Sequence, residues 1–431
     1  MQEPGAFERY LEYLETGEFD FFDEDEIEDI VFGFIDQYQA DDAEKALNFG
    51  LEQHPDSKQL LKLRVIVAIE KEELDRAEAL LAPYLNDGTL QTVDLQFSLA
   101  LHRHEYEAAC NHLISGARKG LLPVLEVCNT LEDFWNDIPK DVMQKALYQL
   151  GDMSQEDAVG LFSVAYVLVK TGDLTTAVEL LNRSLDLDAY NVEAWHSLMG
   201  CYFELHEYDK CLETCDYALA IQEKHILIRF VRGFVLTTKK QYERALEDLK
   251  FLIDCREGRI TNFFPKPDIP IEDREYQLKA GYEMILECYH QLGDSKNAYK
   301  YMQKLVKLKP DDANLHYHIA LHHMNAGNHT MALEYINNAI ELDGSIVSYH
   351  AMKASILTTL GELDEALEVM ELMLKLDPAS KHVTMLAKGE IFMHLGRWKE
   401  ALEIFKQIDK MELDEIFRVR ITKYLKQLEG L

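Results

Sequence analysis

Residues 350–378 read HAMKASILTTLGELDEALEVMELMLKLDP, and Ala366 within them belongs to a register that recurs through most of the chain. The recurring positions are Ala77, Ala109, Met143, Ala177, Cys211, Ala245, Ala298, Ala332, Ala366 and Ala401. From Ala109 onward, neighbouring positions are separated by 34, 34, 34, 34, 53, 34, 34 and 35 residues. Steps of 34 residues are typical of an array in which each unit is a pair of antiparallel helices.

A second register lies twelve residues before the first and supports the same architecture. It holds Val65, Phe97, Leu131, Ala165, Met199, Gly233, Leu286, Ala320, Ala354 and Gly389. Two helices cross closely only where their side chains are small, so paired small residues predict the crossing point inside each unit. Glycine between the registers, as at Gly361, predicts a left-handed cap on the first helix. Pro310 and Pro378 follow second helices, where proline stops a helix.

The pattern resembles the tetratricopeptide repeat family, whose motif reads W-x-x-L, a downstream tyrosine, then alanine, an aromatic, alanine and proline. One repeat here holds Trp195, Leu198, Tyr202 and Ala218, with Cys211 and Cys215 at the alanine and aromatic positions. Another repeat holds Tyr289, Ala298, Leu305 and Pro310. The resemblance covers nearly the whole chain. It implies an all-α fold, a right-handed α-solenoid superhelix of about ten to eleven helix pairs plus a C-terminal capping helix. It also implies a concave groove, lined by the first helices, that binds peptides or proteins.

Length and charge restrict the class of partner. The chain has 431 residues, with 44 basic and 77 acidic side chains and a formal net charge of -33. Length alone suggests about three domains, whereas the repeats predict one continuous solenoid. So large an acidic excess repels phosphate, which makes nucleic acid and anionic membranes unfavourable partners. We expect no secretion signal and no membrane span. The seven cysteines lack C-x-x-C spacing and indicate reduced thiols in a cytoplasmic protein.

The regularity of the register divides the chain into six predicted segments. These are acidic N-terminal helices forming a divergent repeat or cap (1–57), divergent repeats (58–157), regular repeats (158–259), a proline and aromatic insertion (260–278), regular repeats (279–413) and a capping helix (414–431).

Residues 1–60 hold 18 acidic and 3 basic side chains, so nearly half of the net charge lies there. The dense run from Asp23 to Asp29 is open to two interpretations, a cation site or basic-partner surface, and a solvated helix start. The helical spacing of Ile27, Ile30, Val31 and Phe34 favours the helix start.

The resemblance also implies which residues face the groove. Carried over to this chain, the family's groove positions are Phe162, Tyr166, His196, Phe203, Phe230, Phe234 and Tyr317. Further along, the fifth and ninth positions of the first helix hold Ala351 with Ser355 and Leu386 with Glu390. Family members that clamp a chaperone's terminal carboxylate use lysine and asparagine there, and no repeat here presents that pair. The aromatics suit an apolar or amphipathic segment; alternatively, they bury against one another.

The largest break in the register is the 53-residue step between Ala245 and Ala298. The extra segment contains Phe263, Phe264, Pro265 and Pro267, and prolines cannot continue a helix. Insertions in repeat arrays lie in loops, often on a binding face. We expect a loop that either folds over the groove or is pinned by its phenylalanines against neighbouring helices.

Signatures of catalysis are missing from the sequence, including the P-loop, G-x-G-x-x-G, G-x-S-x-G and H-E-x-x-H motifs. We therefore predict no catalytic residue and no cofactor. Histidines cluster at His316, His318, His322, His323 and His329. His318 and His322 share a helix face and could bind a metal. No glutamate or cysteine completes the set, and His316 occupies a repeat position that His350 fills later, so packing is favoured over a metal site.

Together these patterns predict a non-catalytic scaffold that binds a protein or peptide in a concave groove, with self-association left open. The alternative is a regulatory or sensor protein that binds a small ligand or metal through the insertion loop or the histidine cluster. An enzyme built on the array is least favoured.

Overall fold

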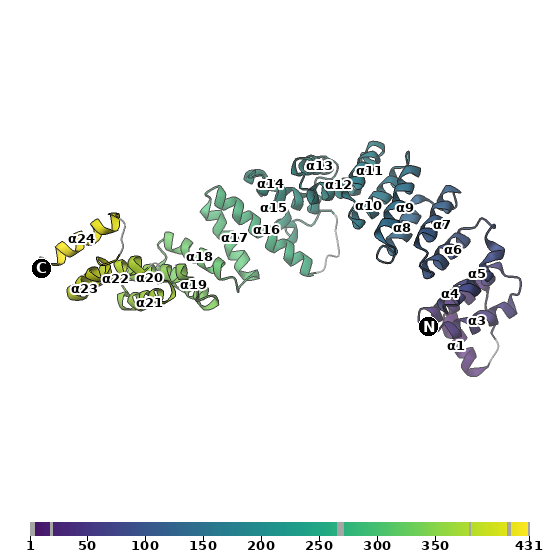
Figure 1. Ribbon diagram of the computed structural model, residues 1–431, viewed down its shortest axis with the longest axis horizontal. Coiled ribbons are helices and arrows are strands. Elements are labelled where there is room, and N and C mark those ends of the chain that lie inside the picture. Colours follow the sequence, from purple (N-terminus) through teal and green to yellow (C-terminus); the bar gives the residue numbers. More distant parts are fainter. Residues whose placement is uncertain (1–4, 18–19, 265–270, 379–380, 412–414, 430–431) are drawn as a thin grey trace. The chain divides into compact units, whose positions relative to one another are not determined.

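The fold is all-helical, as predicted. The computed structural model describes residues 5–17, 20–264, 271–378, 381–411 and 415–429. These residues form 24 α-helices and no β-strand (Figure 1). The chain divides into two compact units, Met1–Glu223 and Lys224–Leu431. None of the described helices is both long and apolar enough to cross a membrane.

Unit 1 contains the helices α1 to α13, with a short 3-10 turn (η1, Ala82–Tyr84) after α5. The helices are α1 (Ala6–Thr16), α2 (Glu24–Ile35), α3 (Ala40–Gln53), α4 (Lys58–Glu70), α5 (Leu74–Leu81), α6 (Leu90–His102), α7 (Tyr106–Arg118), α8 (Val124–Asp133), α9 (Lys140–Met153), α10 (Ala158–Thr171), α11 (Leu174–Leu187), α12 (Val192–Glu204) and α13 (Tyr208–Ile221).

Unit 2 contains the helices α14 to α24. They are α14 (Ile226–Thr238), α15 (Tyr242–Arg256), α16 (Ile271–Gln291), α17 (Ser295–Leu308), α18 (Ala313–Asn325), α19 (His329–Leu342), α20 (Val347–Leu360), α21 (Leu363–Leu376), α22 (Lys381–His394), α23 (Trp398–Ile408) and α24 (Glu415–Glu429). In both units, even-numbered helices from α2 onward are first helices and odd-numbered ones from α3 onward are second helices. The six segments predicted from the sequence remain predictions.

The two registers mark the helix crossings, as expected. Every residue of the first register is buried, including Met143 and Cys211 where alanine is absent. The second register is buried as well, except that Leu286 is half-buried. At Gly389 in α22 the approach is so close that an added Cβ would lie 2.6 Å from the Phe405 ring of α23. All seven cysteines are free thiols and are buried.

The turn between paired helices uses a left-handed residue five positions before the buried slot. Glycine supplies it in five repeats with φ between 72° and 83°: Gly172, Gly293, Gly327, Gly361 and Gly396. Five other repeats hold the same conformation without glycine, at φ near 60°: Tyr38, Glu72, His104, His206 and Lys240. Backbone geometry is therefore repeated more faithfully than sequence.

The acidic N-terminal segment contains a repeat that the sequence reading did not place in register. Ala43 lies 34 residues before Ala77 and is fully buried, as is Val31 twelve residues earlier. Asp23 caps α2, accepting a hydrogen bond from the Glu26 backbone while the Glu26 side chain returns one to the Asp23 backbone. The interpretation of the Asp23–Asp29 run as a helix start is confirmed.

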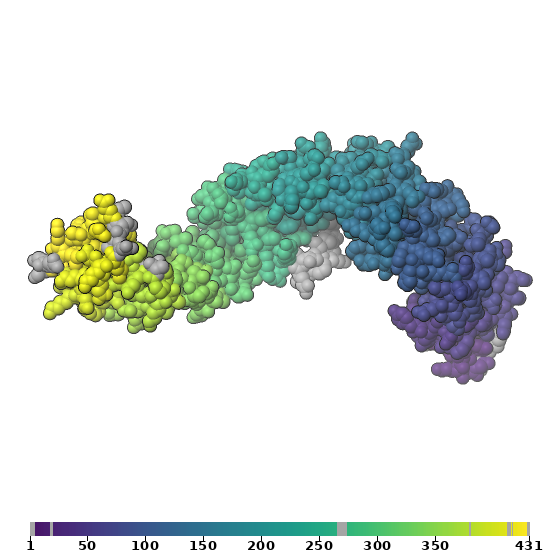
Figure 2. Space-filling view, in the orientation of Figure 1, coloured from purple at the N-terminus to yellow at the C-terminus, as the bar shows by residue number. Residues whose placement is uncertain are grey.

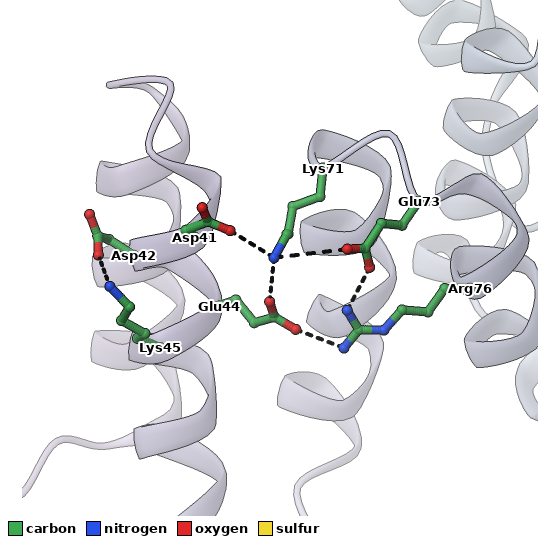
Figure 3. A network of polar contacts seen from close by, with 7 residues as sticks. All are labelled: Asp41, Asp42, Glu44, Lys45, Lys71, Glu73 and Arg76. Atoms are coloured by element: carbon green, nitrogen blue, oxygen red, sulfur yellow. Dashed lines mark hydrogen bonds and ion pairs between the residues drawn. The ribbon is translucent and has the colours of Figure 1, made fainter.

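Part of the acidic excess is neutralised within unit 1 by a network of ion pairs (Figure 3). The Lys71 Nζ atom lies 2.8 Å from an Asp41 oxygen and 2.6 Å from a Glu44 oxygen. Arg76 bridges Glu44 and Glu73 at 2.7 and 2.6 Å. The hydrogen bond from Lys71 is the main cause that lowers the pKa of both Asp41 and Glu44. The network ties α3 to the turn between α4 and α5.

The last helix, α24, carries an apolar stripe on the side that packs against α23. Ile421 and Leu428 are buried, and Phe417, Tyr424 and Leu425 pack partly buried against the same cluster.

The left-handed turn yields a prediction that isolates backbone geometry. Gly172→Ala places a Cβ at φ 78°, where the only neighbour within 4 Å is the Lys140 Nζ atom at 3.6 Å. We expect a loss of about 1–2 kcal/mol in the free energy of unfolding, since L-residues are strained there. The control, Gly200→Ala inside α12, meets nothing within 4 Å and should gain about 0.5–1 kcal/mol. Urea unfolding measures both, and equal effects would contradict this account.

Candidate protein-interaction site

In unit 1, the predicted groove aromatics of α10 form a half-exposed surface. Phe162 is half-buried, and Tyr166 is 40% exposed. Their ring centroids are 6.2 Å apart. The Lys170 ammonium lies 5.0 Å from the Tyr166 centroid and pairs with Glu132 of α8. The surface therefore combines aromatic area with a lysine whose charge is already partnered.

The next first helix in unit 1, α12, carries His196 and Phe203. Both side chains are half-buried, and the Phe203 ring lies 6.3 Å from that of Tyr208. Burial lowers the pKa of His196, and the Glu193 carboxylate partly offsets this effect. His196 is thus a weakly basic, partly covered ring rather than an exposed cation.

In unit 2, the two predicted aromatics of α14 differ in environment. Phe230 packs against the buried cluster of Ile226, Leu252 and Cys255. Phe234 is 39% exposed. Of the two rings, Phe234 is therefore the more accessible at the surface of α14.

A buried carboxylate fixes α14 against α15. Asp248 is fully buried and accepts hydrogen bonds from Arg229 at 2.8 Å and from Arg232 at 2.7 and 2.8 Å. The Arg229 guanidinium also lies 4.6 Å from the Phe251 centroid. Since both arginines flank Phe230 on α14, this triad sets the rotation of the helix that carries Phe230 and Phe234.

Tyr317, the last predicted groove residue, is half-buried in α18. Its ring centroid lies 5.1 Å from that of Tyr349 in α20. Tyr317 thus joins successive first helices, and its role in binding remains a prediction.

A cavity of about 390 Å³ opens between α20, α21 and α22 in unit 2. Ala351, Ser355 and Glu390, which occupy fifth and ninth positions of first helices, line it together with Met370 and Met373. The sequence located these positions but gave no sign of a cavity, because small side chains create it by leaving space.

A second cavity, of about 450 Å³, lies between α16, α17 and α18 and is bordered by His290, His318 and His322. The His322 ring stacks on Tyr299, with centroids 4.1 Å apart and an interplanar angle of 7°. Burial lowers the pKa of His318 and of His322, with smaller contributions from His290 and His323 respectively.

His323 and His316, two further histidines of the cluster, make packing contacts. His323 Nε2 lies 2.9 Å from the Tyr299 hydroxyl. His316 fills the same repeat position as His350 and Trp195. In each of the three residues a ring nitrogen lies 2.9 Å from the backbone carbonyl oxygen six residues earlier, which belongs to Pro310, Gly344 and Ala189 respectively. The packing role favoured for His316 is confirmed. In the part of the chain that the structure describes, no group of three or more potential ligands could hold a metal.

The start of the insertion is pinned to unit 2. The Phe264 N–H donates to the Lys224 carbonyl at 2.9 Å, and its carbonyl accepts from the Ile226 N–H at 2.8 Å. Phe263 packs against the cluster that holds Ile226 and Leu252. Pro265 and Pro267 lie outside the described residues. Of the two alternatives for the insertion, the anchoring of Phe263 and Phe264 is observed, and a binding role for the insertion remains a prediction.

The helix pairs, their buried small residues and their left-handed turns recur with a period of 34 residues in both units. The chain folds as an array of tetratricopeptide-type repeats. Residues 274–416 also match a family described as the auxiliary subunit of N-terminal acetyltransferase A.

Several relatives of this tetratricopeptide array have names that describe them as subunits or organisers of protein complexes. They include the Hsp70-Hsp90 organizing protein of Triticum aestivum, 23% identical over 50% of this chain and 40% of the relative. Anaphase-promoting complex subunit 3 of Schizosaccharomyces pombe is 22% identical over 52% of this chain and 31% of its own. The BBSome complex member BBS4 of Bos taurus is 20% identical over 81% of this chain and 62% of the relative. The chain thus spans roughly a third to three-fifths of these relatives.

Solved structures with detectable similarity include YrrB, described as a TPR protein with an unusual peptide-binding site. YrrB is 18% identical, with an alignment that covers 47% of this chain and 94% of the YrrB chain. The TM-score is 0.37. A tetratricopeptide repeat protein from Parabacteroides merdae is also 18% identical, covers 63% and 98%, and gives a TM-score of 0.33.

The arginine triad predicts a large loss on removal of its carboxylate. Asp248→Ala removes the carboxylate that Arg229 and Arg232 share. Both arginine side chains are less than a fifth exposed, so water replaces this carboxylate poorly. We expect unit 2 to lose about 3 kcal/mol of unfolding free energy. The control Asp364→Ala removes a carboxylate that is 89% exposed and should cost about 1 kcal/mol or less. A similar loss in both variants, measured by urea unfolding, would contradict a structural role for the triad.

The cavity histidines predict that stability falls in mild acid. Because folding lowers the pKa of His318 and His322, the unfolded chain takes up protons first as pH falls below about 6.5, and the folded state loses stability. His318→Gln with His322→Gln should reduce the fall in melting temperature between pH ~7.5 and ~5.5. The control His394→Gln, at an exposed histidine, should leave the fall in melting temperature unchanged. If the double variant shows the same fall as the wild type, His318 and His322 are not its cause.

Proposed function

We propose that the chain is a non-catalytic scaffold that holds a segment of another protein against the groove-facing sides of its first helices. The observation that carries the proposal is the half-exposed aromatic surface at first-helix positions, Phe162 and Tyr166 in unit 1 and Phe234 in unit 2. Aromatic side chains supply large contact areas and are enriched at protein interfaces.

The chemistry of these surfaces indicates the kind of segment that fits. Tyr166 and Phe234 offer ring faces, and Lys170, which lies over the Tyr166 ring, is engaged by Glu132. An apolar or amphipathic segment would bury this area without needing a counter-charge. The cavity at Ala351, Ser355 and Glu390 would accept a side chain from such a segment further along unit 2.

Names of the relatives support a role in assemblies. An organizing protein for chaperones, an anaphase-promoting complex subunit and a BBSome member each carry that role in their names. Their partners are not transferred to this chain, because it matches only part of each relative.

The groove proposal predicts that two exposed rings control partner recovery. Tyr166→Ala with Phe234→Ala should reduce recovery of at least one partner tenfold or more in quantitative pull-downs, since an anchoring aromatic contributes about 2 kcal/mol. Tyr190 and Tyr276 are 80% and 69% exposed and lie outside the groove positions, so Tyr190→Ala with Tyr276→Ala is the matched control.

A partner that binds at the groove positions should be lost from the pull-down with Tyr166→Ala and Phe234→Ala but kept with Tyr190→Ala and Tyr276→Ala. Purified partner and fluorescence anisotropy then give the affinity ratio. Equal recovery of every partner by the wild type and the groove variant would reject the proposed surface.

A further inference from the structure

A hollow of about 690 Å³ lies along one edge of unit 1, at three successive turns between paired helices. The first turn joins α4 to α5, the second joins α6 to α7, and the third joins α8 to α9. The hollow is lined by Glu72 and Leu74 at the first turn, Leu101, His102, His104 and Tyr106 at the second, and Phe134 and Asp137 at the third. These turns belong to the blue part of unit 1 in Figure 2. We call this surface the turn hollow, and it does not include the groove aromatics.

The backbone around the turn hollow is held by the left-handed turns that recur through the array. Glu72 and His104 both have φ of 60°. The Glu72 N–H donates to the Ile69 carbonyl at 2.8 Å, and the His104 N–H donates to the Leu101 carbonyl at 2.9 Å. Because these hydrogen bonds fix the rim of the hollow, binding there costs little ordering of the backbone.

Part of the lining of the turn hollow is apolar. Leu74, Leu101 and Phe134 are half-buried and contribute one side chain or two from each turn. The Phe134 ring packs edge-on against that of Phe97, which is buried, with centroids 5.4 Å apart. The hollow thus contains apolar area and a fixed aromatic ring, on which a planar cation can stack.

The charge of the turn hollow is negative. Glu72 and Asp137, from the first and third turns, are exposed, and within the described residues neither carboxylate has an ion pair. In the same part of the chain, no lysine or arginine lines the hollow. Arg103, in the second turn, is engaged by Asp75 at 3.0 Å and by Glu78 at 2.8 Å. The hollow therefore presents two uncompensated carboxylates beside apolar surface.

The second turn adds hydrogen-bond acceptors to the turn hollow. The Nδ1 atom of His102 lies 2.8 Å from the Ser98 carbonyl oxygen, so Nδ1 carries the hydrogen and Nε2 of the neutral ring is an acceptor. The Tyr106 hydroxyl lies 2.9 Å from the Nδ1 atom of His104, and its oxygen has a further lone pair. A guanidinium presents five N–H donors in one plane, is always charged and ends an apolar stem. Arginine thus matches the acceptors, the charge and the apolar lining together.

We propose that the turn hollow binds a basic, arginine-bearing segment of a partner protein. The arginine stem would pack against the leucines of the hollow, and its guanidinium would pair with Glu72 or Asp137. The same carboxylates repel phosphate, so a nucleic acid does not fit here. The proposal goes beyond the scaffold function, because it names a second surface whose partner is basic, and it leaves Tyr166 and Phe234 free.

Fluorescence anisotropy of the full chain with a short labelled peptide of alternating arginine and leucine tests the proposal. Glu72→Gln with Asp137→Asn should weaken binding about fivefold or more, because two charge-assisted contacts to guanidinium are lost. The matched control Asp152→Asn with Glu156→Gln removes the same charge from two exposed carboxylates at and beyond the end of α9. Asp152 lies about 18 Å along α9 from Lys140, at the third turn. At ~150 mM salt the control should bind within about twofold of the wild type, since screening limits distant charges.

Two further peptides establish what the turn hollow recognises. Lysine in place of arginine keeps the charge and should weaken binding about threefold or more, because lysine lacks the planar set of donors. Glutamine in place of arginine removes the charge and should abolish binding. Equal binding of the lysine peptide would overturn the assignment to arginine, and equal binding of the glutamine peptide would show an apolar occupant instead.

The remaining comparison separates the turn hollow from the groove. Tyr166→Ala with Phe234→Ala should bind the arginine peptide like the wild type, and a loss of binding there would place the peptide at the groove and overturn the proposal. Circular dichroism checks that every variant keeps its helices. The proposal is also overturned if the wild type and the Glu72→Gln, Asp137→Asn variant bind the arginine peptide with equal affinity.

Discussion

The structure depends on one constraint, the close crossing of two helices at a small buried residue every 34 positions. At Gly389 the neighbouring ring of Phe405 leaves no room for a Cβ atom, and Ala332, Ala366 and Ala401 are fully buried in the same unit. Since each crossing fixes only one pair, stability is built from local pairs and their nearest neighbours. Polar contacts such as that of Lys71 with Glu44 join adjacent repeats, and the Asp248 triad joins the two helices of one repeat.

Because one side of each first helix is occupied by its partner, the opposite side is available for other tasks. In α10 the buried side holds Leu161, Val164 and Ala165, while Tyr166 points a large part of its ring outward. In α14 the Asp248 triad holds the helix in a rotation in which Phe230 is partly buried and Phe234 is 39% exposed. The proposed binding surface thus follows from the helix crossings, and the side chains at a few exposed first-helix positions determine its chemistry.

The sequence predicted the helix pairs and their crossings because small residues at a fixed period leave a direct trace. It did not place Ala43 and Val31 in register, because the surrounding acidic residues obscured the pattern. His206 and Lys240 hold left-handed turns that sequence assigns to glycine, since the rest of the turn enforces the geometry. The contrast between Phe230 and Phe234 depends on the packing of Phe230 against Ile226, Leu252 and Cys255, and the cavity at Ser355 depends on what small side chains leave unfilled. Neither has a local sequence signature.

Hydrogen exchange with and without a purified partner tests most directly whether the first-helix faces bind protein. The account predicts protection on first helices that carry groove positions, α10, α12 or α14, with further protection at α20 and α22 for a segment long enough to reach the cavity. Protection confined to second helices or to inter-repeat turns, with the first helices unchanged, would contradict it.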